Sequence, residues 1–163
     1  MSKQLSLKTI EKENEIYKEK INIPLTVDGQ EFVIKLTPFF APLKIKNAMK
    51  MFGEFCQEAD KDKVEIKNED VFDIINCFLI KEFTDIKFGA RKAKTILAEF
   101  KQLMNNQLYR ELMEAFPPAS LEEAHGYFND MNALAAKVEN MIKRTQEKVK
   151  NLPLDNPEIL KGE

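Results

Sequence analysis

The sequence has few of the residues that usually carry catalysis or bind metals. Its 163 residues include one histidine, His125, and two cysteines, Cys56 and Cys77. A zinc site built from His and Cys needs closely spaced ligands, and these three residues match no such spacing. We therefore expect no metal and no cofactor.

Sequence motifs of catalysis are missing as well. The chain has no glycine-rich phosphate loop, no H-E-x-x-H and no G-x-S-x-G. A Cys-His catalytic pair is open in principle, but both cysteines fall within apolar helical patterns that are typical of reduced core residues. We expect His125 to be a partly exposed helical residue, and we find no carboxylate pair arranged for acid–base catalysis. The protein is therefore not expected to be an enzyme.

Long apolar runs and a strong net charge are also absent. No run approaches the roughly 20 residues that cross a bilayer, and the start of the chain lacks the apolar core of a signal peptide. The 25 basic and 27 acidic residues nearly cancel, so no global field favours nucleic acid or an anionic membrane. We expect a cytoplasmic, single-domain globular protein without a membrane partner.

The segment 21–40, "INIPLTVDGQEFVIKLTPFF", carries the one β-strand pattern. Asp28-Gly29 is the dipeptide that a two-residue type I′ turn prefers, and a turn there pairs Val27 with Gln30. That register gathers apolar residues of both strands on one face: Ile21, Ile23, Leu25, Phe32, Ile34 and Leu36. Since an isolated hairpin is marginal in water, we expect this face to pack on the helices that follow.

The two edges of this hairpin differ. Pro24 falls in a pair without hydrogen bonds, where proline is tolerated and discourages a further strand. The edge along residues 30–36 has no proline, and Lys35 is its only basic residue. We expect this edge to be open to another strand or to a second copy of the protein.

Three helices are predicted after the hairpin from apolar residues at helical spacing. Pro42 suits the first turn of the first helix, which reaches about Ala59. The second, from about residue 68 to 83, is apolar nearly all round and is expected to be central. The third is expected to begin near Gly89 and to run without a break to about Ala115.

A fourth, long helix is predicted after Ser120, which forms a capping box with Glu123. Apolar residues alternate spacings of three and four along it, as in a heptad repeat. We call these positions the C-terminal seam: Leu121, Ala124, Phe128, Met131, Ala135, Val138, Ile142, Thr145, Val149 and Leu152. At about 1.5 Å per residue the helix is longer than a compact domain of this size, so it either bends, near Gly126, or projects.

The predicted fold is mostly α with a small N-terminal β-hairpin (α+β), a bundle of about four helices whose last member is long and bent or projecting. We divide the chain into a charged arm of residues 1–20, a hairpin and helical domain of residues 21–118, a long C-terminal helix of residues 119–152, and a flexible tail of residues 153–163.

Two apolar features are candidates for partner binding. Phe39 and Phe40 follow the hairpin; we favour the interpretation that they seal it onto the helices, and an exposed patch is the alternative. The C-terminal seam is either the core face of a bundle helix or a surface for docking or self-association, to which methionines would lend adaptability. The candidate residues are Phe39, Phe40, Phe128, Met131, Val138, Met141, Ile142 and Val149.

A basic cluster precedes the third predicted helix and consists of Lys87, Arg91, Lys92 and Lys94. Such clusters are most often the solvated start of a helix, and no basic-aromatic module accompanies this one. Binding of nucleic acid is therefore a weaker alternative.

Three stretches carry a family resemblance: "PLTVDGQEFVIKLTPF", "DVFDIINCFLIKEFTD" and "LAEFKQLMNNQLYRELMEAFPP". Their order, a short β segment before a compact helical domain, resembles the tail assembly chaperones of long-tailed bacteriophages and related prophages. The resemblance covers about residues 20–118. The C-terminal seam is less typical of that family.

The resemblance implies a non-enzymatic role in the host cytoplasm. Such chaperones coat the tape measure protein, keep it soluble, help tail tube subunits assemble around it, and leave the finished particle. Its partners would be the tape measure protein and the tail tube protein, together with a possible homo-oligomer. Two other functions stay open: a structural or scaffold coiled coil that self-associates through the C-terminal seam, and a small regulator that binds nucleic acid.

Overall fold

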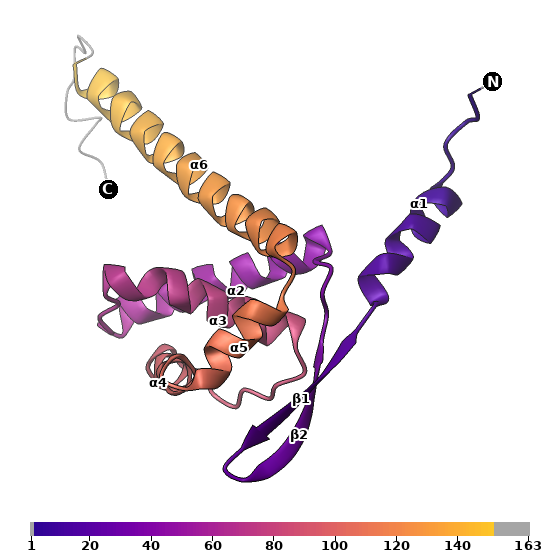
Figure 1. Cartoon of the computed structure of the whole chain (residues 1–163). Coiled ribbons are helices and arrows are strands. Elements are labelled where there is room, and N and C mark those ends of the chain that lie inside the picture. Colours follow the sequence, from indigo (N-terminus) through magenta and orange to yellow (C-terminus); the bar gives the residue numbers. More distant parts are fainter. Residues whose placement is uncertain (1, 152–163) are drawn as a thin grey trace. The chain divides into compact units, whose positions relative to one another are not determined.

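The computed structural model describes residues 2–151, and for residues 133–139 it describes only the backbone. The elements in chain order are α1 (Leu7–Glu13), the 3-10 helix η1 (Asn14–Lys18), β1 (Ile21–Val27), β2 (Gln30–Leu36), α2 (Pro42–Lys61), the 3-10 helix η2 (Asn68–Asp70), α3 (Val71–Phe83), α4 (Ala93–Met104), α5 (Gln107–Ala115) and α6 (Pro118–Lys150) (Figure 1). The predicted fold class, mostly helical with an N-terminal hairpin, is confirmed. The chain divides after His125 into two units, which are described separately.

The N-terminal arm is partly helical. Its two short helices, α1 and η1, bury no side chain. An exposed salt bridge between Lys18 and Glu15, at 2.9 Å, is of the kind that adds little stability.

The hairpin has the predicted register. β1 and β2 pair antiparallel, with Leu25 opposite Phe32 and Pro24 opposite Val33. Asp28 and Gly29 both have positive φ, at 53° and 73°, as a type I′ turn requires. Glycine adopts this backbone without strain and aspartate tolerates it, so the dipeptide determines where the chain reverses.

The apolar face of the hairpin is only partly covered. Along β2 the exposed fraction rises from 0% at Leu36 to 8% at Ile34 and 48% at Phe32. Ile21, at the start of β1, is also exposed. The expectation that the whole face packs on the helices is therefore wrong, because Leu36 and Ile34 are buried while Phe32 and Ile21 of the same face are exposed.

The core is built around α3, as its all-round apolar pattern predicts. Every residue from 74 to 80 is buried. The Phe78 ring packs edge-on against Phe55 of α2 and Phe100 of α4, with ring centroids 5.6 and 4.8 Å apart. Such edge-to-face pairs add to the stabilisation that burial of each ring gives. α3 is thus the element on which α2 and α4 pack.

The predicted third helix is two helices in the structure. α4 ends at Met104, and α5 begins at Gln107. Between them Asn106 is extended, and its side chain accepts a 2.9 Å hydrogen bond from the Leu108 amide. Asparagine is a favoured N-cap because its oxygen satisfies an amide that the helix leaves free. The prediction of an unbroken helix to Ala115 is therefore wrong. The Asn-Asn pair at residues 105 and 106 is the feature of the sequence that indicates the break.

The capping box at Ser120 is also a wrong prediction. α6 begins at Pro118, so Ser120 lies inside its first turn. The buried Ser120 hydroxyl instead donates a 2.7 Å hydrogen bond to the carbonyl oxygen of Pro38. This bond ties the start of α6 to the chain that follows β2.

The predicted long C-terminal helix is present as α6, whose 33 residues continue through Gly126. Leu152, the last residue of the seam, and the predicted tail of residues 153–163 lie outside the described residues.

Candidate docking site beside the hairpin

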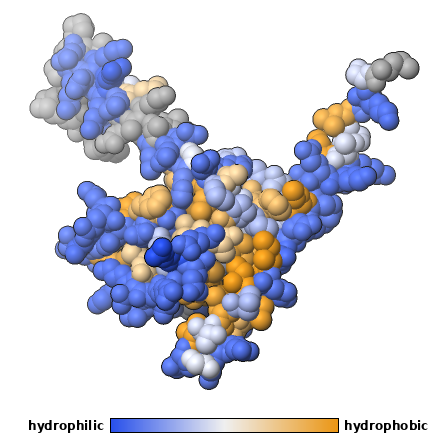
Figure 2. Space-filling model, viewed as in Figure 1, coloured by the Kyte–Doolittle hydropathy of each residue, from blue (hydrophilic) through white to orange (hydrophobic). Residues whose placement is uncertain are grey.

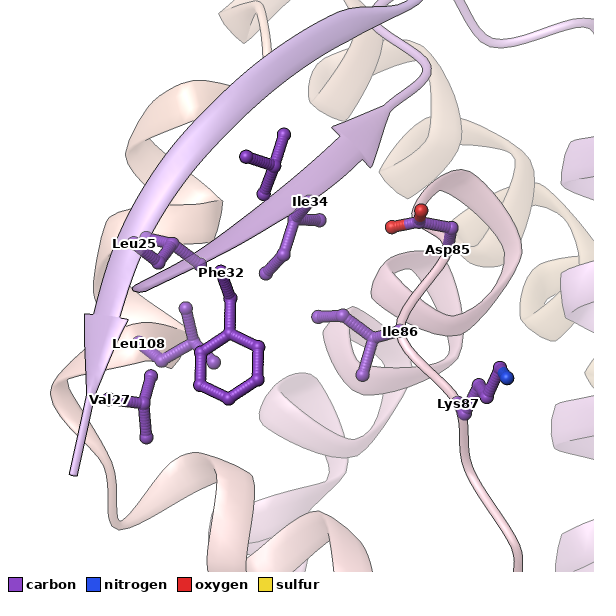
Figure 3. Close-up of a pocket in the computed structure, with 9 residues that line it drawn as sticks. Leu25, Val27, Phe32, Ile34, Asp85, Ile86, Lys87 and Leu108 are labelled. Carbon is purple, nitrogen blue, oxygen red and sulfur yellow. The ribbon is translucent and has the colours of Figure 1, made fainter. Parts of the chain in front are cut away.

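An apolar hollow of about 580 Å³ lies under the uncovered part of the hairpin (Figure 3). We call it the hairpin hollow. It is lined by three parts of the chain: Leu25, Val27, Phe32, Val33 and Ile34 of the hairpin, Asp85, Ile86 and Lys87 of the segment after α3, and Leu108 of α5. All of these residues belong to the unit that ends at His125. Its side chains are almost all hydrocarbon, so it suits the apolar part of a partner.

The segment after α3 closes one end of the hairpin hollow by pairing with β2. The Asp85 amide donates to the Lys35 carbonyl oxygen at 3.1 Å, and the Lys35 amide donates to Asp85 Oδ1 at 2.9 Å. Next to them, the Thr37 amide donates to the carbonyl oxygen of Phe83 at 2.8 Å. Residues 83–85 therefore act as a short third strand at the end of β2.

Beyond Asp85 this segment parts from β2, and the hollow opens between them. In Figure 3 the Ile86 side chain faces Phe32 and Ile34 across the hollow, while Leu108 lies at its floor beside Val27. The Phe32 ring and Val33 are 48% and 63% exposed. Water thus reaches apolar groups of the hairpin wall, which is unfavourable at about 25 cal/mol for each Å² left uncovered.

The surface around this site is apolar as well. Figure 2 shows hydrophobic residues gathered over the hairpin, between hydrophilic surfaces of the helices and of the hairpin tip. Two charged groups flank the hollow, the Asp85 carboxylate and the Lys87 ammonium. Contiguous exposed apolar surface with a polar rim is typical of an interaction site.

Phe39 and Phe40, the first two predicted partner residues, lie in different environments. Phe40 is buried and stacks on Phe83 with ring centroids 3.8 Å apart. Its edge-on contact with Phe116, at 5.3 Å, completes a cluster that seals the hairpin onto the helices, as the favoured interpretation predicts. We therefore place Phe40 in the core. Phe39 is exposed and stays available to a partner.

The predicted partner residues of the C-terminal seam also differ in exposure. Phe128 is buried, so no partner reaches its ring in this conformation, whereas Met141 and Ile142 are 67% and 52% exposed. Met131 and Val149 are half-buried, and Val149 lines a small hollow with Thr145. The side chain of Val138 lies outside the described part of the chain. The exposed apolar stripe of α6 is therefore centred on Met141 and Ile142.

A hydrogen-bonded polar network crosses the core between α3, α5 and α6. The Tyr109 hydroxyl donates to Asp73 Oδ1 at 2.6 Å and accepts from the Asn76 amide at 3.1 Å. His125 Nε2 lies 2.7 Å from Asn76 Oδ1, which can only accept, so His125 donates. Every member has a partner within the network, and none of the four lines the hairpin hollow. We read the network as structural.

The protonation states of this region follow from burial. Burial lowers the pKa of His125 and so keeps the imidazole neutral. The pKa of Tyr109 is raised by burial and by its hydrogen bond to Asp73. Burial, and next to it the Asp73 charge, raise the pKa of the Cys77 thiol to about 12. Cys77 is therefore an unreactive core thiol, as expected, and half-buried Cys56 is also free.

Metal and membrane sites find no support in the part of the chain that the structure describes. Among the side chains that the structure describes, no cluster of histidine, cysteine and carboxylate ligands would hold a metal ion. Within the same residues no helix has both the length and the apolar character that crossing a bilayer demands. The basic cluster is exposed at Lys87, Arg91, Lys92 and Lys94.

None of the residues that line the hairpin hollow is among the predicted partner-binding residues, and its apolar walls include Phe32, Ile86 and Leu108. Phe32 belongs to the hairpin face that is expected to pack on the helices, and Leu108 lies within the helix predicted to run without a break to Ala115. Two features of the sequence indicate this site: the Asn-Asn pair before Leu108, which breaks the helix, and the edge of β2, which has no proline. Ile86 carries no such signal, because a single apolar residue in a loop predicts no partner.

The comparisons with known proteins identify a family. No curated protein and no solved structure matches the chain. A family model, YomO, matches residues 7–161, which is nearly the whole sequence. That family is associated with phages and prophages. The chain therefore belongs to the YomO family.

Proposed function

We propose that this protein is a tail assembly chaperone of a phage or prophage, acting without catalysis in the host cytoplasm. It binds apolar segments of the tape measure protein, keeps that protein soluble, and helps to recruit tail tube subunits. One observation carries the proposal: the hairpin hollow is an open apolar site with Phe32 half exposed at its wall.

Three further features support this function. The family association with phages matches the resemblance of residues 20–118 to tail assembly chaperones. A tape measure protein presents long apolar stripes, which need cover until the tail tube encloses them. The exposed Met141 and Ile142 of α6 would add a second, adaptable apolar contact.

Co-expression with the tape measure protein of the same genome tests the proposal. We expect that protein to become soluble and to co-purify with the chain. The same measurement with the tail tube protein added tests recruitment. If the tape measure protein stays equally insoluble and does not co-purify, the proposed function is wrong.

A matched pair of variants tests whether the tape measure protein binds at the hairpin hollow. Phe32→Ser removes an apolar group from the hairpin hollow, and Leu43→Ser removes one that is 78% exposed on α2, outside the hollow. We expect the first variant to lose most of the co-purified tape measure protein and the second to retain it. Phe32 is half exposed, so urea unfolding of both variants is measured to check that each is still folded under the conditions of the co-purification.

Self-association through α6 is a second candidate function. The observation that favours it is the pair of adjacent exposed apolar side chains, Met141 and Ile142, on a helix with heptad spacing. Light scattering of the wild type and of Ile142→Glu tests it. A monomer in both cases removes this candidate, and an oligomer that Ile142→Glu dissociates supports it. Truncation before α6 is a poorer test, because it removes the buried Ser120 and Ala124.

A further inference from the structure

The open edge of β2 adds a second kind of binding group to the hairpin hollow. Lys35 directs both its amide and its carbonyl group out of the hairpin, to Asp85. Backbone direction alternates along a strand, so Val33 and Glu31 also direct their amide and carbonyl groups outward. Within the described residues no hydrogen bond reaches these groups. The amide groups of Glu31 and Val33 are therefore two hydrogen-bond donors beside the hollow, and their carbonyl groups are two acceptors, without a protein partner within the described residues.

We propose that the hairpin hollow binds its ligand as an extended peptide strand, which adds to the edge of β2 at Glu31 and Val33 and inserts alternate apolar side chains between Phe32 and Ile86. Residues 83–85 already pair with β2 in this manner, one step further along the same edge. The bound peptide would continue that short third strand toward the hairpin turn. Main-chain hydrogen bonds would give affinity, and the apolar lining would select the side chains.

A helical ligand fits the site less well. A helix satisfies its own backbone groups, so it would bury the outward groups of Glu31 and Val33 without giving them partners. An extended segment uses both the edge and the hollow. In addition, side chains of a strand alternate in direction, so every second residue would enter the hollow.

A second copy of the hairpin also fits less well. Antiparallel pairing of two β2 strands about Phe32 would bring Gly29 of each copy opposite Lys35 of the other. The outward groups of Lys35 are already bonded to Asp85. A single peptide strand that ends before Lys35 meets no such obstacle.

This inference rests on the proposed function for the identity of the natural ligand, the tape measure protein. The strand-binding mode itself can be tested without that protein. The probe is a synthetic octapeptide that alternates valine with threonine and carries a fluorescent label and terminal lysines. The control peptide has the same composition with its valines three and four residues apart, as in an amphipathic helix. Fluorescence anisotropy with the full chain measures binding, and we expect the alternating peptide to bind more tightly by about tenfold or more.

Two changes to the backbone test the edge itself. Val33→Pro removes the outward amide of Val33, which the hairpin does not use because Val33 and Pro24 form a pair without hydrogen bonds. We expect it to weaken binding of the alternating peptide by about tenfold relative to the matched Val33→Ala. N-methylation of one alternate set of peptide amides should abolish binding, and methylation of the other set should not. This second change leaves the protein intact, so it remains decisive if Val33→Pro does not fold.

Failure of the strand-binding mode and failure of the proposed function give different results. Equal binding of the two peptides, or equal effects of the two methylation patterns, would overturn the strand mode. A wild-type dimer that Val33→Pro dissociates would overturn it too and would assign the edge to a second copy. If the alternating peptide binds as expected but the tape measure protein does not co-purify, the strand mode stands and the proposed function fails.

Discussion

Lys35 and Asp85, fifty positions apart, exchange two hydrogen bonds: the Asp85 amide donates to the Lys35 carbonyl oxygen, and the Lys35 amide donates to Asp85 Oδ1. This pair joins the edge of β2 to the segment after α3. It also marks where that segment parts from β2, so it determines where the hairpin hollow begins.

Asp85→Ala should loosen this junction. The variant keeps the bond from residue 85 to the Lys35 carbonyl oxygen but leaves the Lys35 amide without its acceptor. The site is exposed, so we expect the free energy of unfolding to fall by only about 0.5–1.5 kcal/mol. Hydrogen exchange of the Lys35 amide should become faster, while Ile34, on the inner side of β2, keeps its protection. Unchanged exchange at Lys35 would contradict the assigned bond.

Ser120→Ala should cost more, because it acts in the core. The buried Pro38 carbonyl oxygen would lose its 2.7 Å hydrogen bond from the Ser120 hydroxyl. An unsatisfied buried acceptor costs about 1–3 kcal/mol, which urea unfolding measures directly. Ser6→Ala is the control, since the Ser6 hydroxyl is exposed and bonds only to Thr9. Equal effects of the two changes would show that the buried bond contributes nothing.

Stability should fall as the pH drops below about 6.5, because of His125. Burial lowers its pKa in the folded protein, so the unfolded chain takes up the proton first. The loss begins near the unfolded pKa and continues until the folded imidazole titrates. The groups that face this ring are Asn76 and the Phe72 ring, whose centroid is 4.9 Å away.

Urea unfolding at about pH 7.5 and about pH 5.5 measures this loss. His125→Gln can keep the hydrogen bond to Asn76 without a titrating group, so its stability should change less over the same interval. A variant that loses as much stability as the wild type would assign the pH dependence to other groups.

The two cysteines should differ in reactivity. The pKa of Cys77 is raised to about 12, and its side chain is fully buried, whereas Cys56 is only half-buried. Since the thiolate is the reacting form, iodoacetamide at about pH 8 should modify Cys56 well before Cys77. Mass spectrometry of tryptic peptides reads both sites. In urea the two rates should become similar, and a persisting difference would point away from burial as the cause.

Local features of the fold were predictable because their signals are local. Asp28-Gly29 determines the turn and therefore every pair of the hairpin, since side chains alternate with a period of two. The apolar run of α3 predicts a central helix, because such a helix is stable only when surrounded. The break at Asn106 was local too and was overlooked, since the apolar stripe continues across it.

The sequence by itself thus determined the hairpin, its register, the central helix and the long last helix, because spacing and turn chemistry act between residues close in the chain. Only the tertiary structure decided which apolar residues are covered. Phe32 in the hairpin and Phe40 after it are both expected to pack on the helices, yet Phe40 stacks on Phe83 and Phe32 borders an open hollow. That difference depends on where residues 83–87 and Leu108 come to lie, since burial is a property of distant segments brought together. For the same reason the candidate site was visible only once β2 and the segment after α3 were placed side by side.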